Sequence, residues 1–592
     1  MRSTIPSPEP DVLSCQEPQV RSRWQRLGGL LTALPAVLVI GVCSALPMIW
    51  MVGAVIMASP QVRTELHVTS FRAELMARTI GYNGLAAVIA TLMGLPAAFV
   101  LGRGRGPIAK AMWVILPAAL LMPSLSYAYG WAQFVRLVRV SLANHYGTPF
   151  LQKYGLTFPP GGVADTLRCI WSLAAWLWAV PAGLIGLALR RLDTNIQQQA
   201  LLDGAPRRVA LRQLMPAIIA SMAVVTVLAT QEFAVYEPTG ISVVATEVRM
   251  VFDTGAFSSP ANPIAGPVIQ GSGGHEAHGQ SERAAAAVAT AFPLLLVSIA
   301  LAGIVVWAAG RTSAAEAISI GQWPRVLDAS KASIITTLVL LTLNVGVPVW
   351  ALVKSLRNPH TPWGVFNEFE PQTLGAVFVA LVAASLAGVA GFSAAGRWPR
   401  GALVLAGASF LLGGQLLAIA DIRIYNRPGL VWAYDNFPVP VFAYVGRFGW
   451  LALAAAWATY SRPWRELRDM ASVDGAGPFR TALGVVWPLA WPTLLAGGLL
   501  VGALSMTEVP ATVLIFPQNP QVLTPQLMTW VHMAHFDPMI EASLLMMSVV
   551  LLPALAAVAL VGLGLTIARR ATGLPRAGTL APTVHFPSNR SP

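Results

Sequence analysis

The sequence predicts an all-α polytopic membrane protein in which about 12 transmembrane helices form two homologous six-helix halves. Three observations predict this fold class. Of the 592 residues, 55% are hydrophobic and only 11% are charged, whereas a soluble domain carries roughly 25% charged residues. A soluble protein of this composition would expose too much apolar surface to stay dispersed. Long runs without charge recur along the chain, and polar segments of the N-terminal part have counterparts in the C-terminal part.

The hydrophobic runs have the length of membrane-spanning helices. Roughly 20 helical residues cross about 30 Å of hydrocarbon, and runs of this length without two-residue alternation are not strands. Eleven runs contain no Asp, Glu, Lys or Arg, and a twelfth is interrupted only by Arg447. The predicted spans are 27–62, 79–102, 111–135, 169–189, 214–231, 284–310, 332–353, 371–396, 401–420, 439–461, 481–507 and 542–568. The first run is too long, and follows too long a polar tail, to be a cleaved signal peptide.

Lys and Arg set the predicted orientation, because cytoplasmic loops are enriched in them. If both termini are cytoplasmic, 25 of the 39 basic residues fall on the inner side. The net charge of +13 is therefore interpreted as a topology signal, and no nucleic-acid partner is expected.

Two pairs of polar segments predict an internal duplication. Gly-Arg-Gly-Arg-Gly-Pro at 102–107 is matched by Gly-Arg-Trp-Pro-Arg-Gly at 396–401, and the long basic segments 190–213 and 462–480 both contain Asp-Gly-Ala. The alternative to a duplication is that short basic inner loops occur in any polytopic protein. This alternative accounts for the short Gly-Arg pair well but for the two long segments less well. The predicted organisation is a cytoplasmic tail (1–26), a first half (27–310), a linker (311–331), a second half (332–570) and a cytoplasmic C-terminal tail (571–592).

The two long segments share a pattern suited to docking. Each has a helix-forming stretch that ends at a glycine, Gly204 or Gly475, because glycine adopts the positive φ that stops a helix. A short helix then leads to a proline, Pro216 or Pro488, at the predicted start of the next span. A short amphipathic helix outside the membrane is suited to binding another protein.

These loops resemble the EAA loop of bacterial ABC-importer permeases, which reads Glu-Ala-Ala, three residues, Gly, nine residues and Ile-x-Leu-Pro. In the first loop the matching positions are Gln198, Gln199, Ala200, Gly204, Leu214, Met215 and Pro216. In the second loop they are Asp469, Met470, Ala471, Gly475, Val485, Trp487 and Pro488. The first loop closes one residue short of the family spacing. The resemblance implies that both loops are coupling helices that dock on an ATP-hydrolysing subunit.

A second resemblance concerns the segments that follow the fifth and eleventh spans. The sequence TEVPATVLIFPQNPQVLTPQLMTWV from Thr507 is similar to a segment of ferric-iron and thiamine permeases, which fuse two half-permeases in one chain. TQEFAVYEPTG from Thr230 resembles the corresponding first-half segment, with Glu232 and Phe233 kept and Ala234 in place of glycine.

Taken together, the resemblances imply a permease of the type I ABC-importer fold in the bacterial inner membrane. The expected partners are two ATP-binding subunits, an extracytoplasmic substrate-binding protein and the lipid bilayer. Ferric iron is the preferred substrate, with thiamine or a phosphonate as alternatives.

The chain carries no recognisable catalytic chemistry of its own. Nothing matches the phosphate-binding loop G-x-x-x-x-G-K-[ST], so we expect a transport permease without an ATPase site, without a cofactor and without a metal site. The three cysteines, Cys15, Cys43 and Cys169, have no ligand spacing. His275 and His278 lie in a Gly- and Ser-rich segment that is better explained as an outer loop insertion than as a metal site.

Glu232 and Glu508 are the candidate residues of a translocation path. Each follows the span that comes after a coupling loop. A carboxylate at a membrane boundary is costly unless it is paired or wet, and two such groups would suit a cationic substrate. The alternative is simple helix termination at the interface. Arg447 is expected to extend its charge to the outer interface.

Two other function classes remain open. A major-facilitator carrier also has twelve spans, and Gly-Arg-Gly-Arg-Gly-Pro faintly resembles its loop between spans two and three. However, the carrier pattern needs an upstream Asp that is absent here, and such carriers lack paired loops before spans five and eleven. A membrane-embedded enzyme would need an acidic or histidine cluster at one membrane face, which the sequence does not show.

Overall fold

The structure is a computed structural model that describes residues 33–67, 69–104, 106–147, 162–192, 199–200, 202–255, 275–312, 330–395, 399–459 and 462–571. Within these ranges the regular structure is helical, apart from one isolated bridge between Gln518 and Gln521. Ten of the described helices are long and apolar enough to cross a membrane, and two bent helix pairs raise the number to as many as 12. The prediction of an all-α, multi-pass membrane protein is therefore confirmed.

Every predicted run overlaps one of the helices or bent pairs. The elements before residue 313 are η1 (Gly41–Ala45), α2 (Leu46–Ile56), α3 (Pro60–Thr64), α4 (Ser70–Arg103), α5 (Pro107–Ile115), η2 (Leu116–Leu121), α6 (Ser124–Tyr146), α8 (Val163–Leu177), α9 (Ala179–Arg190), α11 (Pro206–Thr230), η3 (Glu237–Thr239), α12 (Val244–Thr254) and α13 (His275–Thr312). Those after residue 330 are α14 (Lys331–Leu341), η5 (Thr342–Gly346), α15 (Val347–Ser355), α16 (Pro362–Glu368), α17 (Glu370–Ala395), α18 (Pro399–Tyr425), α19 (Val431–Asp435), α20 (Pro438–Thr459), α21 (Arg462–Val473), α22 (Pro478–Thr481), η6 (Ala482–Val486), α23 (Trp487–Thr507), α24 (Pro510–Ile515), α25 (Leu523–His532) and α26 (Phe536–Ala571).

The third and fourth spans differ from the straight helices that their hydrophobic runs suggest. Residues 107–121 and α6 meet at an angle of 87°, and α8 and α9 meet at 40°. At the sharper bend Met122 is extended, with ψ 139°, and Pro123 follows it. A residue before proline avoids helical backbone angles, so this dipeptide interrupts the helix inside the hydrophobic run. Hydrophobicity alone did not reveal the break.

In the part of the chain that the structure describes, three five-residue π-helical turns each lie just before a proline. They are η1 before Pro47, η5 before Pro348 and η6 before Pro488. A helical proline lacks an N–H and crowds the carbonyl four residues earlier, and a wider turn relieves that crowding. The carbonyl of Asn344, four residues before Pro348, instead accepts a hydrogen bond from the Tyr127 hydroxyl at 2.6 Å. Because η1 and η5 lie in the first spans of the two halves, the same local feature recurs at corresponding places.

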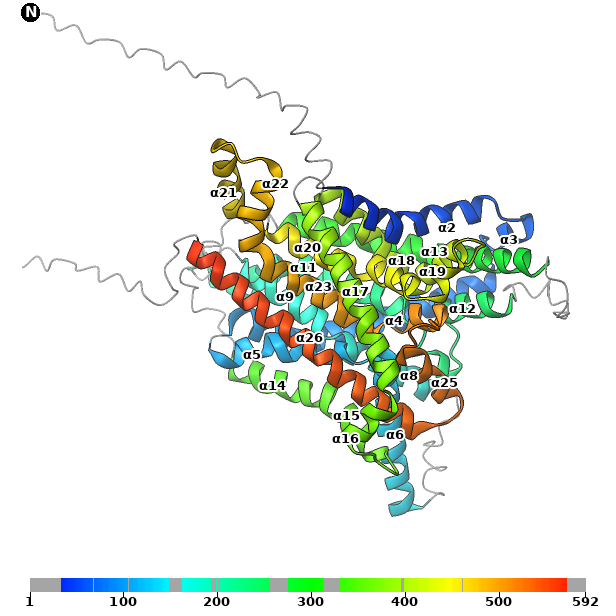
Figure 1. The fold of residues 1–592 in the computed structure, drawn as a ribbon. Helices are drawn as coiled ribbons and strands as arrows, with labels where there is room; N and C mark the ends of the chain where they lie inside the picture. Colours follow the sequence, from blue (N-terminus) through cyan, green and yellow to red (C-terminus); the bar gives the residue numbers. More distant parts are fainter. Residues whose placement is uncertain are drawn as a thin grey trace, which may run out of the picture.

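The two halves are interlocked through their first spans. Helices α4, α9, α11 and α13 pack together, as do α17, α20, α23 and α26. However, η1 and α2 contact α18 and α20, while α14 and α15 contact α4 and α6. Figure 1 shows α14 alongside α5, with α21 and α22 projecting from one end of the bundle. Each half therefore packs its first span on the other.

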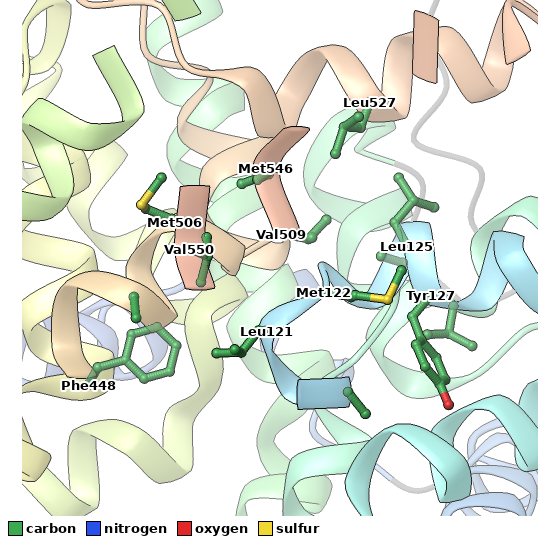
Figure 2. Close-up of a cluster of buried hydrophobic side chains, with 14 of the residues drawn as sticks. Leu121, Met122, Leu125, Tyr127, Phe448, Met506, Val509, Leu527, Met546 and Val550 are labelled. Atoms are coloured by element: carbon green, nitrogen blue, oxygen red, sulfur yellow. The ribbon is translucent and has the colours of Figure 1, made fainter. Parts of the chain in front are cut away.

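The core between the halves is apolar. Figure 2 shows the broken third span facing α20, α23, α25 and α26 of the second half. The residues of this interface, all buried, are Leu121, Met122, Leu125 and Tyr127 on one side and Phe448, Met506, Val509, Leu527, Met546 and Val550 on the other. The break thus places the third span where it closes the space between the two halves.

Candidate functional site

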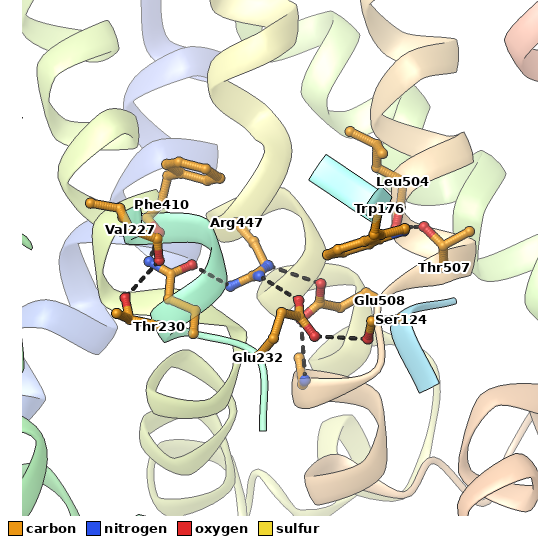
Figure 3. A network of polar contacts seen from close by, with 12 residues as sticks. Ser124, Trp176, Val227, Thr230, Glu232, Phe410, Arg447, Leu504, Thr507 and Glu508 are labelled. Atoms are coloured by element: carbon orange, nitrogen blue, oxygen red, sulfur yellow. Dashed lines mark hydrogen bonds and ion pairs between the residues drawn. The ribbon is translucent and has the colours of Figure 1, made fainter. Parts of the chain in front are cut away.

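Arg447, in α20, is the centre of a buried polar network between the halves (Figure 3). Its Nε lies 2.8 Å from Oε2 of Glu508, and its Nη2 lies 3.8 Å from Oε1 of Glu232. Arg447 is 2% exposed, and each glutamate is 4% exposed. Charges away from water at membrane depth are costly unless they are paired. The guanidinium and the two carboxylates therefore stabilise one another.

Glu232 belongs to the first half and is held by its broken third span. It is the second residue after the end of α11, and the hydroxyl of Ser124 donates to its Oε2 at 2.7 Å. Ser124 is the first residue of α6, immediately after the Pro123 break. The bend that closes the interface therefore also supplies the hydrogen-bond donor for this carboxylate.

Glu508 belongs to the second half and is held by backbone as well as by Arg447. It follows the last residue of α23, and its Oε1 accepts the N–H of Ala511 at 3.3 Å. On its other side lies Gly414 of α18, where an added Cβ would come within 2.0 Å of Oε1. Glycine at 414 is therefore required for the carboxylate to lie in this position.

Gln231 connects Arg447 to a helix break in α18. Arg447 Nη1 donates to Gln231 Oε1 at 3.2 Å, and Gln231 Nε2 donates to the carbonyls of Phe410 and Leu411 at 3.3 and 3.1 Å. Gly413 has non-helical angles, φ 81° and ψ 159°, which interrupt the helical bonding of those carbonyls. The Gly413 break thus provides acceptors for a side chain of the other half.

The structure brings the two predicted glutamates together but encloses them. They meet at the interface of the halves, where neither is open to solvent in this conformation. The expectation that Arg447 extends to the outer interface is wrong, because its side chain is buried against Glu508 and Glu232. Arg447 was the one charged residue inside a predicted span, and this position was the sequence signal that it pairs with a buried acid.

Asp421 is a buried charge that the sequence analysis missed. It lies in α18, is 0% exposed, and neither carboxylate oxygen has a hydrogen-bond partner among the described residues. The hydrophobic run was ended at Ala420 because Asp421 is charged, whereas the helix continues to Tyr425. A method that ends each predicted span at the first charged residue therefore cannot include a buried acid within the span.

The two predicted coupling loops contain the same turn. Gly204 and Gly475 have φ of 69° and 78°. The residue after each glycine donates its N–H to the carbonyl five positions earlier, Ala205 to Ala200 and Ala476 to Ala471, both at 2.9 Å. This is the Schellman pattern of helix termination. The prediction that both glycines stop a helix is confirmed.

Each turn presents an apolar side chain to solvent at the same position. Two residues before the glycine, Leu202 is 89% exposed and Val473 is 85% exposed. Asp469 is also exposed, whereas Ala200 is buried, and Gln198 lies outside the described residues. The two turns therefore expose an apolar side chain at equivalent positions.

The end of the first loop differs from the prediction. Pro216, with Leu214, lies inside α11, which runs without interruption from Pro206 to Thr230. Pro488 follows η6, which contains Val485 and is continuous with α22 and α23. Pro216 therefore lies within its helix and not at its start, whereas Pro488 lies in the first turn of α23 as expected. In the first half, the segment after the Gly204 turn and the following span form one helix. The single-residue difference between the loops falls in the turn, where the second loop carries the additional Gly477.

A second contact joins the halves at the end of the bundle away from α21 (Figure 1). Glu237 of η3 pairs with Arg249 of α12, and His532 Nε2 of α25 lies 3.7 Å from Glu237 Oε1. Partial burial raises the pKa of Glu237, while Arg249 and then His532 oppose that rise. This contact is more exposed than the Arg447 network.

The remaining predicted positions add no site. Cys43 and Cys169 are buried free thiols, and Cys15 lies outside the described residues. His275 and His278 begin α13, and their side chains lie outside the described part of the chain. No protein-family model and no curated protein matches this sequence.

Proposed function

We propose that the chain is the fused permease subunit of an ATP-driven importer. The observation that carries the proposal is the repetition of one mechanical unit. A Schellman turn with an exposed apolar residue begins a helix that crosses the membrane and leads to a buried glutamate. The first unit ends at Glu232 and the second at Glu508, and both reach Arg447.

The continuity of each unit supports coupling over distance. The helix from Pro206 to Thr230 links the Gly204 turn directly to Gln231 and Glu232. The second unit runs from Pro478 to Thr507 and then Glu508. Two ATP-binding subunits that hold the loops would therefore move the ends of these helices. We place the loops and both termini in the cytoplasm and the chain in the bacterial inner membrane.

The buried network would be the closed state of the path. Separation of the halves breaks the contacts of Arg447 with Glu232 and Gln231, whereas the shorter contact with Glu508 lies within the second half. The freed Glu232 would then meet the substrate delivered by an extracytoplasmic binding protein. Two carboxylates against one guanidinium favour a cation, and oxygen ligands suit ferric iron. Thiamine or a phosphonate remains the alternative, and a major-facilitator carrier is the less supported class.

The docking role is tested with Leu202→Glu and Val473→Glu. Both side chains are exposed, so we expect an unchanged fold and loss of a co-purifying ATP-binding subunit from detergent extracts. Met533→Glu is the control, because Met533 is 62% exposed at the opposite end. Unchanged co-purification in the double variant, or ATP-independent uptake by sealed vesicles, would contradict the proposal.

The path role is tested with Glu232→Gln combined with Glu508→Gln. We expect loss of ferric-iron uptake by cells that also produce the ATP-binding and substrate-binding partners. Because the double variant leaves Arg447 unpaired, a third change, Arg447→Gln, provides a charge-neutral version with the same expected loss. Normal uptake by either folded variant would exclude the two glutamates from the path.

A further inference from the structure

His360, Glu368 and Glu541 form a cluster outside the Arg447 network. Each offers one ligand atom, and these atoms lie within 4.8 Å of one another. His360 precedes α16, Glu368 is the last residue of α16, and Glu541 lies in the second turn of α26. Figure 1 places α16 at the end of the bundle away from α21 and α22. Among the described residues this is the one group of at least three His, Cys, Asp or Glu side chains close enough to hold a metal ion.

The backbone around the cluster is held by the start of α26. The carboxylate of Asp537 accepts the N–H groups of Arg357 and Asn358, both at 3.4 Å. One turn later, Glu541 Oε1 accepts the N–H of His360 at 2.8 Å. Thr361 then caps α16 by accepting the N–H of Gly364 at 3.1 Å. The loop and α16 are therefore positioned before any ion binds.

The distances between His360 and Glu541 are those of neighbouring ligands of a small metal ion, and the Glu368 carboxylate lies within 4.8 Å of both. His360 Nδ1 lies 3.0 Å from Oε2 and 3.1 Å from Oε1 of Glu541. An ion with bonds of about 2.0–2.2 Å holds neighbouring ligand atoms roughly 3–3.5 Å apart. We propose that His360, Glu368 and Glu541 bind one divalent first-row transition ion, with Zn²⁺ as the preferred occupant.

The ligand types favour this class of ion. One imidazole with two carboxylates suits Zn²⁺, whereas Ca²⁺ and Mg²⁺ prefer oxygen ligands alone. Glu541 is 4% exposed near the end of a span, where an anionic group needs compensating charge. The His360 side chain is 61% exposed, so an ion can enter from solvent and keep water in its remaining positions. The bound ion would link α16 to α26 and stiffen this end of the second half, whatever the chain transports.

The test uses the full chain, purified in detergent without a histidine tag and stripped with a chelator. Titration with ZnCl₂ against a competing chelator should show one saturable ion per chain. We expect His360→Ala and Glu368→Gln to weaken binding at least about tenfold, since even the outer-shell partners of a ligand are worth roughly 10- to 100-fold in affinity. Zn²⁺ should raise the Tm of the wild-type chain but not of His360→Ala.

Two matched variants control for other sites. His535→Ala removes an exposed histidine, and Glu370→Gln removes an exposed acid two residues beyond Glu368. Both should bind Zn²⁺ as the wild type does, and an excess of Mg²⁺ or Ca²⁺ should not displace it. No saturable binding by the wild type overturns the proposal. Equal affinity in wild type, His360→Ala and Glu368→Gln also overturns it, because the ion would then bind elsewhere.

Discussion

The two halves reach the buried centre by different helix breaks in their third spans. In the first half, Met122-Pro123 bends the span by 87° and presents Ser124 to Glu232. In the second half, Gly413 interrupts α18, so that two carbonyls bind Gln231 and Gly414 leaves room for Glu508. The glutamates correspond in position, but the arginine comes from one half only. The helices that correspond in the two halves therefore place one glutamate each at the site. The arginine and the two helix breaks have no counterpart, so the two halves contribute different charges.

The largest expected effect is that of removing the shared cation. Arg447→Met would leave two buried carboxylates side by side, and breaking a buried pair costs about 3–5 kcal/mol. Unfolding in detergent should show this loss, whereas Arg139→Met, at an exposed position, should change little. If the added changes Glu232→Gln and Glu508→Gln fail to restore stability to Arg447→Met, the loss does not come from the unpaired acids.

The first-half support is tested by Ser124→Ala. A hydrogen bond to a charged group is worth about 1.5–3 kcal/mol, and Glu232 would lose the donor at 2.7 Å. Ser548→Ala is the control, because the exposed Ser548 hydroxyl donates to the carbonyl of Leu544 in its own helix. Equal stability of the two variants in chemical denaturation would mean that the Pro123 break does not support Glu232.

The second-half support is tested by Gly414→Ala. The added methyl group collides with Glu508 Oε1, and overpacking of this kind costs about 1–3 kcal/mol. Gly407→Ala, on the same helix with no atom within 4 Å of the added Cβ, should be neutral or stabilising. A Tm for Gly414→Ala at or above that of Gly407→Ala would show that α18 moves freely away from Glu508.

The smallest effect should be equal in the two halves. Gly204→Ala and Gly475→Ala place a side chain at positive φ, which costs about 1 kcal/mol. Hydrogen exchange at Ala205 and Ala476 should accelerate to the same degree, because both N–H groups make the same bond. Gly477→Ala, without positive φ, should leave exchange unchanged. A response at one loop only would show that the turns are not equivalent.

Local chemistry explains how much of the fold could be predicted. The spans follow from hydrophobic runs because hydrocarbon provides no hydrogen-bond partners, so the backbone must bond within a helix. The loop turns follow from Gly204 and Gly475 because few other residues accept positive φ. The Met122-Pro123 dipeptide indicates the bend, because a residue before proline avoids helical angles. A search for hydrophobic runs does not detect it, because both residues are apolar.

The candidate site was only partly predictable. Glu232 and Glu508 were found because they recur at corresponding positions, whereas Arg447 was expected to extend its charge to the outer interface. Asp421 was missed because its charge ended the hydrophobic run at Ala420, and the His360 cluster was missed because its members come from separate segments, at the two ends of α16 and in α26.

The sequence alone therefore determined that the chain forms apolar helices, where many of them lie and where two of the loops turn. These properties depend on residues within one or two helical turns. Only the tertiary structure decided which charges meet: Arg447 and Gln231 are 216 positions apart, and no local pattern pairs them. The physical reason is that a charge at membrane depth must pair with an opposite charge inside the folded protein. Which charges meet depends on how the two halves pack, with each first span against the other half, and on where the helices break.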